Sequence, residues 1–570
     1  MWSCPKSRTL ACGMRQDGGV TGASYEQVVS LEHWLEADPH LPAKSTLEAL
    51  SSDPVGIAKL FASQISFGTA GLRAERGIGP TRMNRVTVRV AARAIGFYLL
   101  REGLEERGVV IGYDARPDSN LYATDTARLL TALGIPCWLI DEPCPTPVVV
   151  WNQRHRAAAA AIVVTASHNP ASDGGYKVYG SDGTQIRPVA AKAIESFMDF
   201  SSLPLEAELS SESEISYLNA SQAVAGYVES VITPGEDDCK ADGINWVYTP
   251  LCGVGGDALE SACVRAGLQP PIRVEQQFDP DGSFPGLPFP NPEEPGTLHL
   301  AKLKAEDEGV GLILANDPDA DRLAVVIRSD EEWRQLTGDE LGLLLCDYQI
   351  RVTSGDTRLS ASSVVSSEAV IALCKAHDIE HVRTLTGFKW IMEPAITHPT
   401  KQWIFGYEEA LGYSVTSEVL DKDGISSAIA FLRLVSDLKA LGKDPLERLD
   451  ELAQQIGLFV TDQVSGQFDP ELVDATLDSL RNKPPLHLNG HEVTEVIDWL
   501  DAPAPSSTNL LQFRAEGGLR VAIRPSGTEP KVKIYMEQVT LEAPTNIREA
   551  RSASKQDLAS LGTFVLSWFT

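Results

Sequence analysis

The chain has 570 residues, too many for one hydrophobic core, so we expect several domains. It carries 49 Lys and Arg residues against 78 Asp and Glu residues, a formal net charge of −29 that disfavours nucleic acid and anionic membrane surfaces as partners. Its content of 43% hydrophobic and 22% charged residues is typical of a soluble globular protein, and no apolar run is long enough to span a bilayer.

The N-terminal residues and the cysteines carry little structural information. Residues 1–22 lack the continuous apolar core of a signal peptide and predict a disordered extension, with Met14 as a candidate start. The nine cysteines are scattered without a CxxC pair. They indicate reduced thiols and a cytoplasmic protein, and support neither a disulfide framework nor a zinc site.

Residues 66–77, SFGTAGLRAERG, are a Gly-rich loop that presents Arg73 and Arg76. By itself this stretch is typical of a flexible loop with exposed basic side chains. If the substrate is an anion, the two arginines could instead help to bind it, because an acidic protein needs a local concentration of basic side chains to hold an anion.

Beyond this loop, apolar runs alternate with helical patterns. The run at 108–116 is followed by helical spacing at 125–135 and by a second run at 136–140, and the alternation recurs at 244–267 and 310–327. This order is the signature of right-handed βαβ units. We therefore expect mostly parallel sheets, with ligands at the loops that follow the carboxyl ends of strands.

Ser167 and His168 lie in VVTASHNPAS, residues 163–172, where an apolar run ends in an Asn-Pro turn. A hydrolase dyad is not indicated, because no GxSxG elbow is present. Two interpretations stay open: a serine that caps a helix, or a nucleophile that needs a metal loop and a phosphate loop beside it.

Three aspartates alternate in ANDPDADRLAV, residues 315–325: Asp317, Asp319 and Asp321. Alternate residues of an extended segment point the same way, and converging carboxylates repel one another unless a cation lies between them. Oxygen ligands suit Mg²⁺. A solvated acidic turn is the alternative, but the preceding apolar strand and the following Arg322 favour a metal site, and the glycine and distant glutamate of an EF-hand are missing.

Two later Gly-containing loops present charge. TLTGFKWI, residues 384–391, carries Lys389, and FGYEEALGY, residues 405–413, places Glu408 and Glu409 among aromatic residues, where carboxylates suit sugar hydroxyls. For each loop alone, a surface turn is the simpler interpretation.

The stretch AIRPSGTEPKVKIY, residues 522–535, crowds phosphate-binding groups into a turn between two β-rich runs. Backbone N–H groups at a glycine turn, two hydroxyls and a guanidinium suit a phosphate monoester. The P-loop pattern is absent, and an ordinary hairpin turn is the weaker alternative. The residues concerned are Arg524, Ser526, Gly527, Thr528 and Lys531.

Together, and in chain order, these stretches resemble the α-D-phosphohexomutase superfamily, which includes phosphoglucomutases and phosphomannomutases. TASHNP resembles its phosphoserine loop, DPDADR its metal loop, GYEEALGY its sugar-recognition loop and RPSGTEPK its phosphate-binding loop. FGTAGLR, TPLCGVG, FPNPEEP and TLTGFKW are similar to the longer branch of the superfamily, which includes phosphopentomutases. The matches run from about residue 66 to residue 537.

The resemblance implies a four-domain α/β fold around a central cleft: three related mixed α/β domains and a smaller C-terminal α+β domain of the TBP-like type. The polar segment at 201–216 and the Gly/Pro turn within 438–457 look like boundaries, and a third is expected near 328–340. The predicted divisions are an extension at 1–22 and domains at 23–212, 213–332, 333–445 and 446–570.

The resemblance also implies a phosphosugar mutase. The enzyme would interconvert hexose 1-phosphate and hexose 6-phosphate, of glucose, mannose or both, through a phosphoserine at Ser167 and a bisphosphate intermediate. Mg²⁺ would be the cofactor and hexose 1,6-bisphosphate the activator. The implied metal ligands are Ser167, Asp317, Asp319 and Asp321.

Other roles follow from the same resemblance. Arg73 would neutralise phosphate charge, and His168 would orient the serine loop. Lys177 matches a lysine proposed as general acid or base, a role that requires a lowered pKa at neutral pH. The implied substrate-binding residues are Arg322, Thr386, Gly387, Lys389, Glu408, Lys422, Arg524, Ser526, Gly527, Thr528 and Lys531.

The sequence departs from the family pattern at three positions. Gly174 stands where asparagine is usual, Cys252 where histidine is usual, and Ala410 where many members have serine, although alanine is common there in the longer branch. None of these changes removes the nucleophile or a metal ligand. A pentose substrate and a non-catalytic sugar-phosphate-binding relative stay open as alternatives, as do monomer and dimer.

Overall fold

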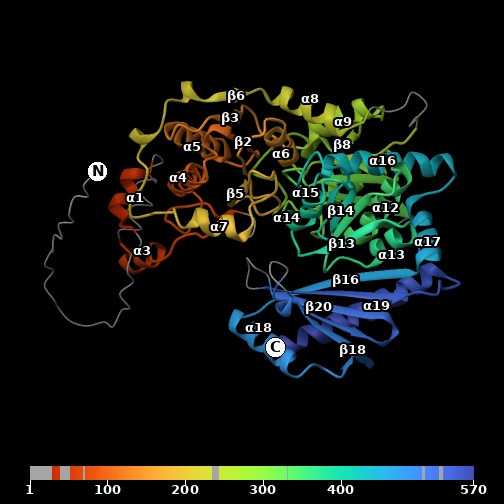
Figure 1. The fold of residues 1–570 in the computed structure, drawn as a ribbon. Coiled ribbons are helices and arrows are strands. Elements are labelled where there is room, and N and C mark those ends of the chain that lie inside the picture. The colour runs from red at the N-terminus through yellow and green to blue at the C-terminus, as the bar shows by residue number, and fades with distance from the viewer. Residues whose placement is uncertain are drawn as a thin grey trace.

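The computed structural model describes residues 29–38, 52–68, 71–233, 243–329, 332–502, 507–525 and 531–570. The predicted extension at 1–22, with Met14, lies outside these residues. Four β-sheets follow one another along the chain, each built from a contiguous segment (Figure 1). Among the described helices, none combines the length and the apolar composition that crossing a membrane requires.

The first domain is built on a six-stranded sheet of order β1-β5-β4-β2-β3-β6. The pairs β2–β3, β2–β4 and β3–β6 are parallel, whereas β5 pairs antiparallel with both β4 and β1. The strands are β1 (Leu72–Glu75), β2 (Val109–Tyr113), β3 (Cys137–Ile140), β4 (Ala160–Val164), β5 (Asp173–Tyr179) and β6 (Ser216–Leu218). The helices are α1 (Leu31–Ala37), α3 (Pro54–Leu60), α4 (Arg85–Glu102), α5 (Ser119–Ala132), α6 (Thr146–His155) and α7 (Pro188–Glu195).

The central strands of this sheet are apolar throughout because helices cover both of their faces. Along β2, Val110 belongs to the apolar cluster that contains α6, whereas Val109 and Ile111 belong to the cluster that contains α4 and α5. Ile162 of β4 shares this second cluster, and its neighbour Val163 the first. The period-2 alternation of a strand thus distributes consecutive apolar residues between two layers of helix.

The second domain repeats this plan with the sheet β11-β10-β9-β7-β8. The pairs β7–β8 and β7–β9 are parallel, and the pairs β9–β10 and β10–β11 are antiparallel. The strands are β7 (Val247–Thr249), β8 (Ile272–Arg273), β9 (Leu312–Asn316), β10 (Leu323–Ser329) and β11 (Glu332–Gln335). The helices are α8 (Ala220–Val231), α9 (Gly256–Ala266), α10 (Glu275–Phe278) and α11 (His299–Asp307).

The third domain has the sheet β13-β12-β14-β15, again parallel except for its last pair, β14–β15. The strands are β12 (Arg358–Ser363), β13 (Glu380–Thr384), β14 (Gln402–Glu408) and β15 (Gly412–Ser414). The helices are α12 (Gly338–Val352), α13 (Ala369–Ala376), α14 (Phe388–Ile391), α15 (Glu393–Thr397), α16 (Gly424–Ala440) and α17 (Pro445–Ile456).

One topological position recurs in these three domains. In each, a strand with parallel partners turns into an antiparallel neighbour: β4 into β5, β9 into β10 and β14 into β15. The turns hold residues 165–172, 317–322 and 409–411. The serine loop, the aspartate loop and the glutamate loop of the sequence therefore occupy equivalent places in three related domains.

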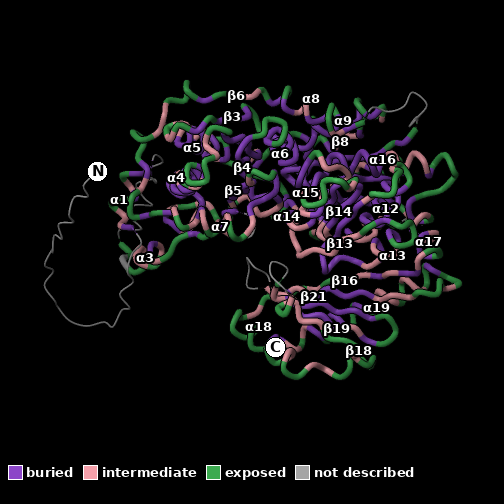
Figure 2. Tube along the Cα trace, viewed as in Figure 1, coloured by how far each residue is buried: buried purple, intermediate pink, exposed green. Residues whose placement is uncertain are grey.

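The fourth domain differs, because its sheet β16-β21-β20-β19-β18-β17 is antiparallel throughout. It has its own apolar core, whereas one continuous buried cluster runs through parts of the first three domains (Figure 2). The strands are β16 (Leu458–Gln467), β17 (His487–Leu488), β18 (His491–Asp498), β19 (Leu511–Ala515), β20 (Leu519–Pro525) and β21 (Lys531–Thr540). The helices are α18 (Pro470–Asn482) and α19 (Ile547–Leu566).

The observed architecture confirms the predicted fold class of three mixed α/β domains followed by a smaller α+β domain. The residue numbers at which we divided the domains stay predictions. All six cysteines that the structure describes are free thiols, as expected for a reduced protein.

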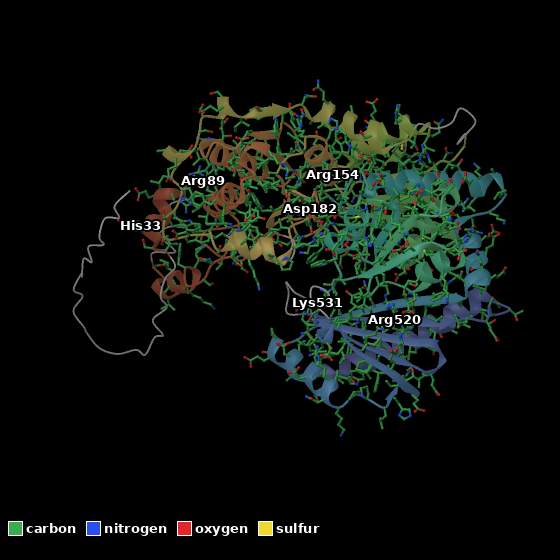
Figure 3. The ribbon with its side chains drawn as sticks, viewed as in Figure 1. His33, Arg89, Arg154, Asp182, Arg520 and Lys531 are labelled. Atoms are coloured by element: carbon green, nitrogen blue, oxygen red, sulfur yellow. The ribbon has the colours of Figure 1, made fainter. Side chains whose placement is uncertain are left out.

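A buried ion pair connects the fourth domain to the third. Arg520 and Glu537 face each other across β20 and β21, with Nε and Oε2 3.0 Å apart (Figure 3 labels Arg520). The arginine donates to the carbonyls of Val364 and Ser366, and the glutamate accepts the backbone N–H of Glu368. Both side chains are less than 5% exposed. The pair is therefore stabilised by the opposite charges of its own members and by hydrogen bonds with the third domain.

Replacing Glu537 with Ala should destabilise the protein strongly, because Arg520 would stay buried without its counter-ion. Loss of one partner of a buried pair costs about 3–5 kcal/mol, so the midpoint of thermal unfolding should fall by several degrees in calorimetry. The matched control is Glu495→Ala, which removes a carboxylate that is 55% exposed and pairs with Arg514. Equal midpoints for the two variants would contradict the prediction.

Candidate active site

Ser167 lies in the turn between β4 and β5 and is 2% exposed. Its φ of 52° is in the left-handed region, and its backbone N–H donates to Thr165 Oγ1 at 2.9 Å. The Oγ hydroxyl donates to Asp317 Oδ2 of the second domain at 2.8 Å. No helix lies between β4 and β5, where the structure describes every residue, so Ser167 does not cap a helix and that interpretation is wrong.

His168 contacts the serine directly, although consecutive side chains seldom face each other. The left-handed turn brings Ser167 Oγ within 3.1 Å of His168 Nδ1. Burial, together with Arg322 and Arg73, lowers the pKa of His168 well below its usual value. The imidazole is therefore neutral at physiological pH and contributes hydrogen bonding rather than charge. This contact supports the prediction that His168 orients the serine loop.

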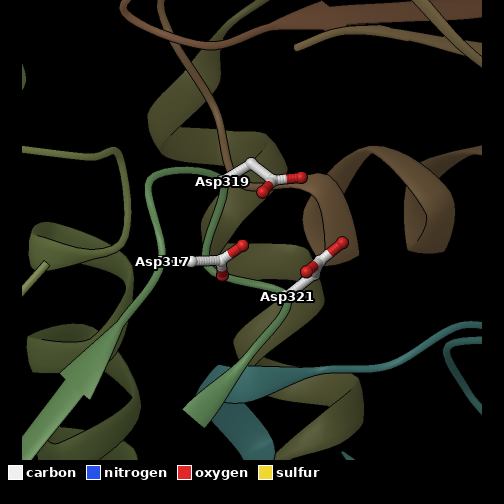
Figure 4. A group of neighbouring side chains, drawn as sticks. All are labelled: Asp317, Asp319 and Asp321. Atoms are coloured by element: carbon white, nitrogen blue, oxygen red, sulfur yellow. The ribbon is translucent and has the colours of Figure 1, made fainter. Parts of the chain in front are cut away.

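The three aspartates lie in the turn that joins β9 to β10, and all three are completely buried. Ala320, with φ 57°, reverses the chain between them, and its N–H donates to the carbonyl of Asp317 at 2.8 Å. One oxygen of each carboxylate lies within 4.8 Å of one oxygen of the other two (Figure 4). Complete burial rules out the alternative of a solvated acidic turn.

Cationic side chains from two other domains compensate these carboxylates. Lys177 Nζ, from β5 of the first domain, lies 2.6 Å from Asp319 Oδ2 and 2.7 Å from Asp321 Oδ2. Lys422 Nζ, from the segment between β15 and α16 of the third domain, lies 2.8 Å from Asp321 Oδ2. The aspartate loop is therefore the point at which three domains meet.

The protonation of these groups follows from burial and charge. Burial, with the neighbouring Asp321, raises the pKa of Asp319. Burial also opposes the charge of Asp321, but Lys177 and Lys422 outweigh it and lower its pKa. Likewise, burial opposes the charge of Lys177, but Asp319 and Asp321 outweigh it and raise the pKa of this lysine. The lowered pKa that a general base requires is not present in this arrangement.

The aspartate loop fits a hard divalent cation. Although both carboxylates are completely buried, Asp319 Oδ1 and Asp321 Oδ1 have no hydrogen-bond partner among the residues that the structure describes. A buried carboxylate oxygen without a donor is energetically costly unless a cation contacts it. Carboxylate oxygens are ligands that Mg²⁺ prefers. These three residues are the one group of potential metal ligands found in the described part of the chain.

Several of the predicted phosphate- and sugar-binding residues lie beside the turns that form this centre. Arg73 is exposed and donates to Asn169 Oδ1 of the serine loop at 3.0 Å. Arg322 follows the aspartates, and its Nη1 lies 3.4 Å from Glu293 Oε2. Glu408 ends β14, directly before the third turn. Three of the predicted groups thus lie at or beside the three equivalent turns.

Two predicted residues contact protein groups instead of facing open space. Lys389 is 5% exposed and donates to the carbonyl of Ile186 in the first domain at 3.2 Å. Burial and the nearby Arg187 lower the pKa of Lys389 to about 8. Lys422 pairs with Asp321, as described above. Both lysines therefore join the third domain to its neighbours in this structure.

The fourth domain reaches the third through Arg524, whose Nη1 donates to Thr386 Oγ1. Gly387 follows with φ 106°, and a Cβ placed there would meet no atom within 4 Å, so the backbone is accessible. Lys531 begins β21. The remaining predicted phosphate-binding residues, Ser526, Gly527 and Thr528, lie outside the described residues.

Two of the three departures from the family pattern, Gly174 and Cys252, lie at buried positions. A Cβ on Gly174 would lie 3.0 Å from Met83 Cβ, so the side chain of Met83 occupies space beside this position. Cys252 is 1% exposed with φ 59°, and its N–H donates to the carbonyl of Gln277. Both positions are packed inside their domains rather than facing the aspartates.

Sequence reasoning missed two polar contacts of the site. Thr146 Oγ1 donates to Asp319 Oδ2 at 2.6 Å from the start of α6. Glu293 faces Arg322 and belongs to FPNPEEP, a stretch that the resemblance included without a role. Nothing in the spacing of Thr146 signals its contact, because the contact joins residues 173 positions apart.

The fold and this site are those of an α/β enzyme that transfers phosphoryl groups, with a buried serine hydroxyl against an acidic loop whose three carboxylates could hold a metal ion. The phosphoglucomutase/phosphomannomutase family models match the chain in order: α/β/α domain I at residues 64–202, domain II at 225–330, domain III at 337–456 and the C-terminal domain at 487–553. The chain belongs to the phosphoglucomutase/phosphomannomutase family.

Individual relatives agree with this assignment. A "Probable phosphomannomutase" of Haemophilus influenzae is 38% identical over 462 residues, which cover 80% of this chain and 93% of that protein. The phosphopentomutase of Homo sapiens is 32% identical over 554 residues, covering 88% of each chain. The crystal structure of parafusin, a phosphoglucomutase from Paramecium in its open form, superposes with a TM-score of 0.67 over 89% of this chain and 96% of that one at 18% identity, which shows the shared fold.

The chain is thus an enzyme, an isomerase of the phosphomutase class, and the family acts on sugar phosphates. The alternative of a non-catalytic relative is set aside, because homologues that align over most of the chain are phosphomutases.

Replacing Asp319 with Asn should weaken Mg²⁺ binding by more than about tenfold, since even neighbours of metal ligands contribute about 10- to 100-fold to affinity. Isothermal titration with MgCl₂ measures this directly. Asp257→Asn, on an exposed residue in the first turn of α9, changes net charge equally and should leave the affinity unchanged. Activity of the wild-type enzyme that survives EDTA would show that the metal assignment is wrong.

Proposed function

We propose that the enzyme interconverts hexose 1-phosphate and hexose 6-phosphate, of glucose, mannose or both, with Ser167 as the phosphoryl carrier. The observation that carries this proposal is the hydrogen bond between Ser167 Oγ and Asp317 Oδ2, which joins the turns of two domains. A serine hydroxyl beside three buried carboxylates suits phosphoryl transfer, because catalysis of that reaction consists mostly of positioning the reacting groups and neutralising their charge.

The reaction consists of two transfers that balance each other. In the first, the bond between phosphorus and Oγ of phosphorylated Ser167 breaks, a bond forms from phosphorus to O6 of hexose 1-phosphate, and the proton of that hydroxyl ends on Oγ. The product is hexose 1,6-bisphosphate. After the bisphosphate reverses in the site, Oγ attacks the phosphorus on O1, the bond between that phosphorus and O1 breaks, and the serine proton ends on O1 of hexose 6-phosphate. Free hexose 1,6-bisphosphate acts as the activator because it phosphorylates unmodified Ser167.

Ser167, Asp317, Asp319 and Asp321 would hold Mg²⁺, which supplies Lewis-acid stabilisation of negative charge on the phosphoryl oxygens. Arg73, beside the serine loop, would offer a guanidinium fork to the same group. Lys177 keeps its proton against the aspartates and would serve as a charge partner in this state. A role as proton carrier would require that those carboxylates be neutralised first.

Substrate recognition would fall to the third and fourth domains. Glu408 is proposed to accept hydrogen bonds from sugar hydroxyls, whereas Glu409 already accepts from Ser363 and Ser366 at 3.1 Å each. Arg524 and Lys531, with Ser526, Gly527 and Thr528, would bind the phosphate that is not reacting. Arg322, Thr386, Gly387, Lys389 and Lys422 would complete the substrate site.

Ser167→Ala should reduce steady-state mutase activity by at least about 10³-fold, because loss of a covalent nucleophile removes both transfers. Intact-mass analysis should detect phosphate on wild-type protein and none on the variant. Ser172→Ala alters an exposed serine of the same loop and should keep both phosphate and activity. Turnover near wild type in Ser167→Ala would exclude the covalent mechanism.

A second candidate function is the phosphopentomutase reaction, between the 1- and 5-phosphates of ribose or deoxyribose. The observation in its favour is the similarity to a phosphopentomutase over 88% of the chain. Against it stands the higher identity to a protein named as a phosphomannomutase. Glucose and mannose share O3 and O4, so a glutamate that binds these hydroxyls accepts both hexoses.

Specificity constants decide between the two substrates. With a trace of the matching bisphosphate, kcat/KM for glucose 1-phosphate or mannose 1-phosphate should exceed that for ribose 1-phosphate by at least about tenfold, the discrimination typical of one carbon unit. The reverse order would assign the enzyme to pentose phosphates. Because the same preparation is measured with all three sugars, differences in active fraction cancel.

A further inference from the structure

Several backbone carbonyls of the serine loop accept hydrogen bonds from one buried guanidinium, that of Arg116. Arg116 Nη2 donates to the carbonyls of Ser167 at 2.7 Å and Asn169 at 2.6 Å. Its Nη1 donates to the carbonyls of Pro170 at 2.5 Å and Asp173 at 3.2 Å. One side chain therefore holds three carbonyls of the loop that carries the nucleophile and the carbonyl of the first residue of β5.

The fifth guanidinium donor is also used. Arg116 Nε donates to Asp114 Oδ2 at 3.2 Å, and the other oxygen of that carboxylate accepts the N–H of Arg116 and the hydroxyl of Ser119. Arg116 is 3% exposed. A guanidinium has five N–H donors in a rigid plane, and here all five are bonded. A lysine at this position has three donors around a single atom and cannot reach the carbonyls that lie around the edges of the guanidinium.

Arg116 is also in contact with the domain that carries the aspartates. Its guanidinium carbon lies 4.8 Å from the ring centroid of Phe284, within the range of a cation–π contact. Beside it, a Cβ on Gly282 would lie 2.3 Å from the Cα of Arg116, so the two backbones approach more closely than a side chain would permit. Arg116 thus touches the serine loop on one side and the second domain on the other.

We propose that Arg116 is a positioning residue for phosphoryl transfer. It holds the serine loop so that Ser167 Oγ meets the aspartate loop, and it does so without touching substrate. This inference rests on the proposed function of Ser167 as phosphoryl carrier. Positioning of this kind has large kinetic effects, because a misplacement of about 1 Å can reduce a rate by about 10²-fold.

Arg116→Lys keeps the charge opposite Asp114 and loses most of the carbonyl contacts. We expect kcat to fall by about 10- to 100-fold with KM nearly unchanged, and the rate at which hexose 1,6-bisphosphate phosphorylates Ser167, followed by intact mass, to fall by the same factor. The matched control is Arg89→Lys. Arg89 lies in the same domain (Figure 3), is completely buried and pairs with Asp125 at 2.9 Å, away from the serine loop.

Thermal midpoints of both variants separate positioning from general destabilisation. The proposal is supported if kcat falls in Arg116→Lys but not in Arg89→Lys. It is overturned if kcat falls equally in the two variants, or if Ser167 is phosphorylated at the wild-type rate in Arg116→Lys. If Arg116→Lys does not fold, Asp114→Asn replaces it as the test variant. We expect a smaller fall in kcat and in the phosphorylation rate of Ser167, with KM nearly unchanged. A wild-type phosphorylation rate in Asp114→Asn, or a loss of kcat equal to that of Arg89→Lys, would overturn the proposal. Absence of phosphate on Ser167 in the wild type would instead contradict the proposed function itself.

Discussion

Three completely buried carboxylates within 4.8 Å of one another set the main constraint on this molecule. Like charges in a low-dielectric interior cannot all be ionised without cations beside them. The second domain, which carries the aspartates, places Arg322 near them, but the direct ammonium contacts come from Lys177 of the first domain and Lys422 of the third. The lysine–aspartate contacts therefore contribute both to the packing of the three domains and to the charge balance of the site. Within the described part of the chain, Asp319 Oδ1 and Asp321 Oδ1 have no hydrogen-bond donor, so both oxygens would be available to a metal ion.

The recurrence of one turn in three domains explains why the chemistry converges. The residues that follow β4, β9 and β14 lie where a strand with parallel partners turns into an antiparallel neighbour. Placing the related domains around a common centre brings these turns together, so that a serine hydroxyl and three carboxylates from different domains share one site. The fourth domain keeps its own core and meets the third through a small apolar cluster and the Arg520–Glu537 pair.

Much of the candidate site could be predicted because each chemical group lies within a short contiguous stretch. The aspartates alternate over five residues, and the serine follows an apolar strand, so local spacing indicates both loops. Arg116 could not be found in this way, since its carbonyl partners lie 51 to 57 positions away. The same holds for Thr146, which bonds an aspartate of another domain. The raised pKa of Lys177 depends on two carboxylates that are remote in sequence.

The sequence by itself determined the alternation of strands and helices, the order of the four loops and the residue types that each presents, because strand periodicity and turn residues are local properties of the chain. The division into three mixed α/β domains and a smaller α+β domain came from the resemblance of those loops to a known family. Only the tertiary structure decided which carboxylate each lysine compensates, that Ser167 adopts a left-handed turn instead of capping a helix, and that one guanidinium holds the serine loop. These outcomes depend on burial and on distances between domains. Both are properties of the packed molecule, in which groups far apart in the chain come within hydrogen-bonding range.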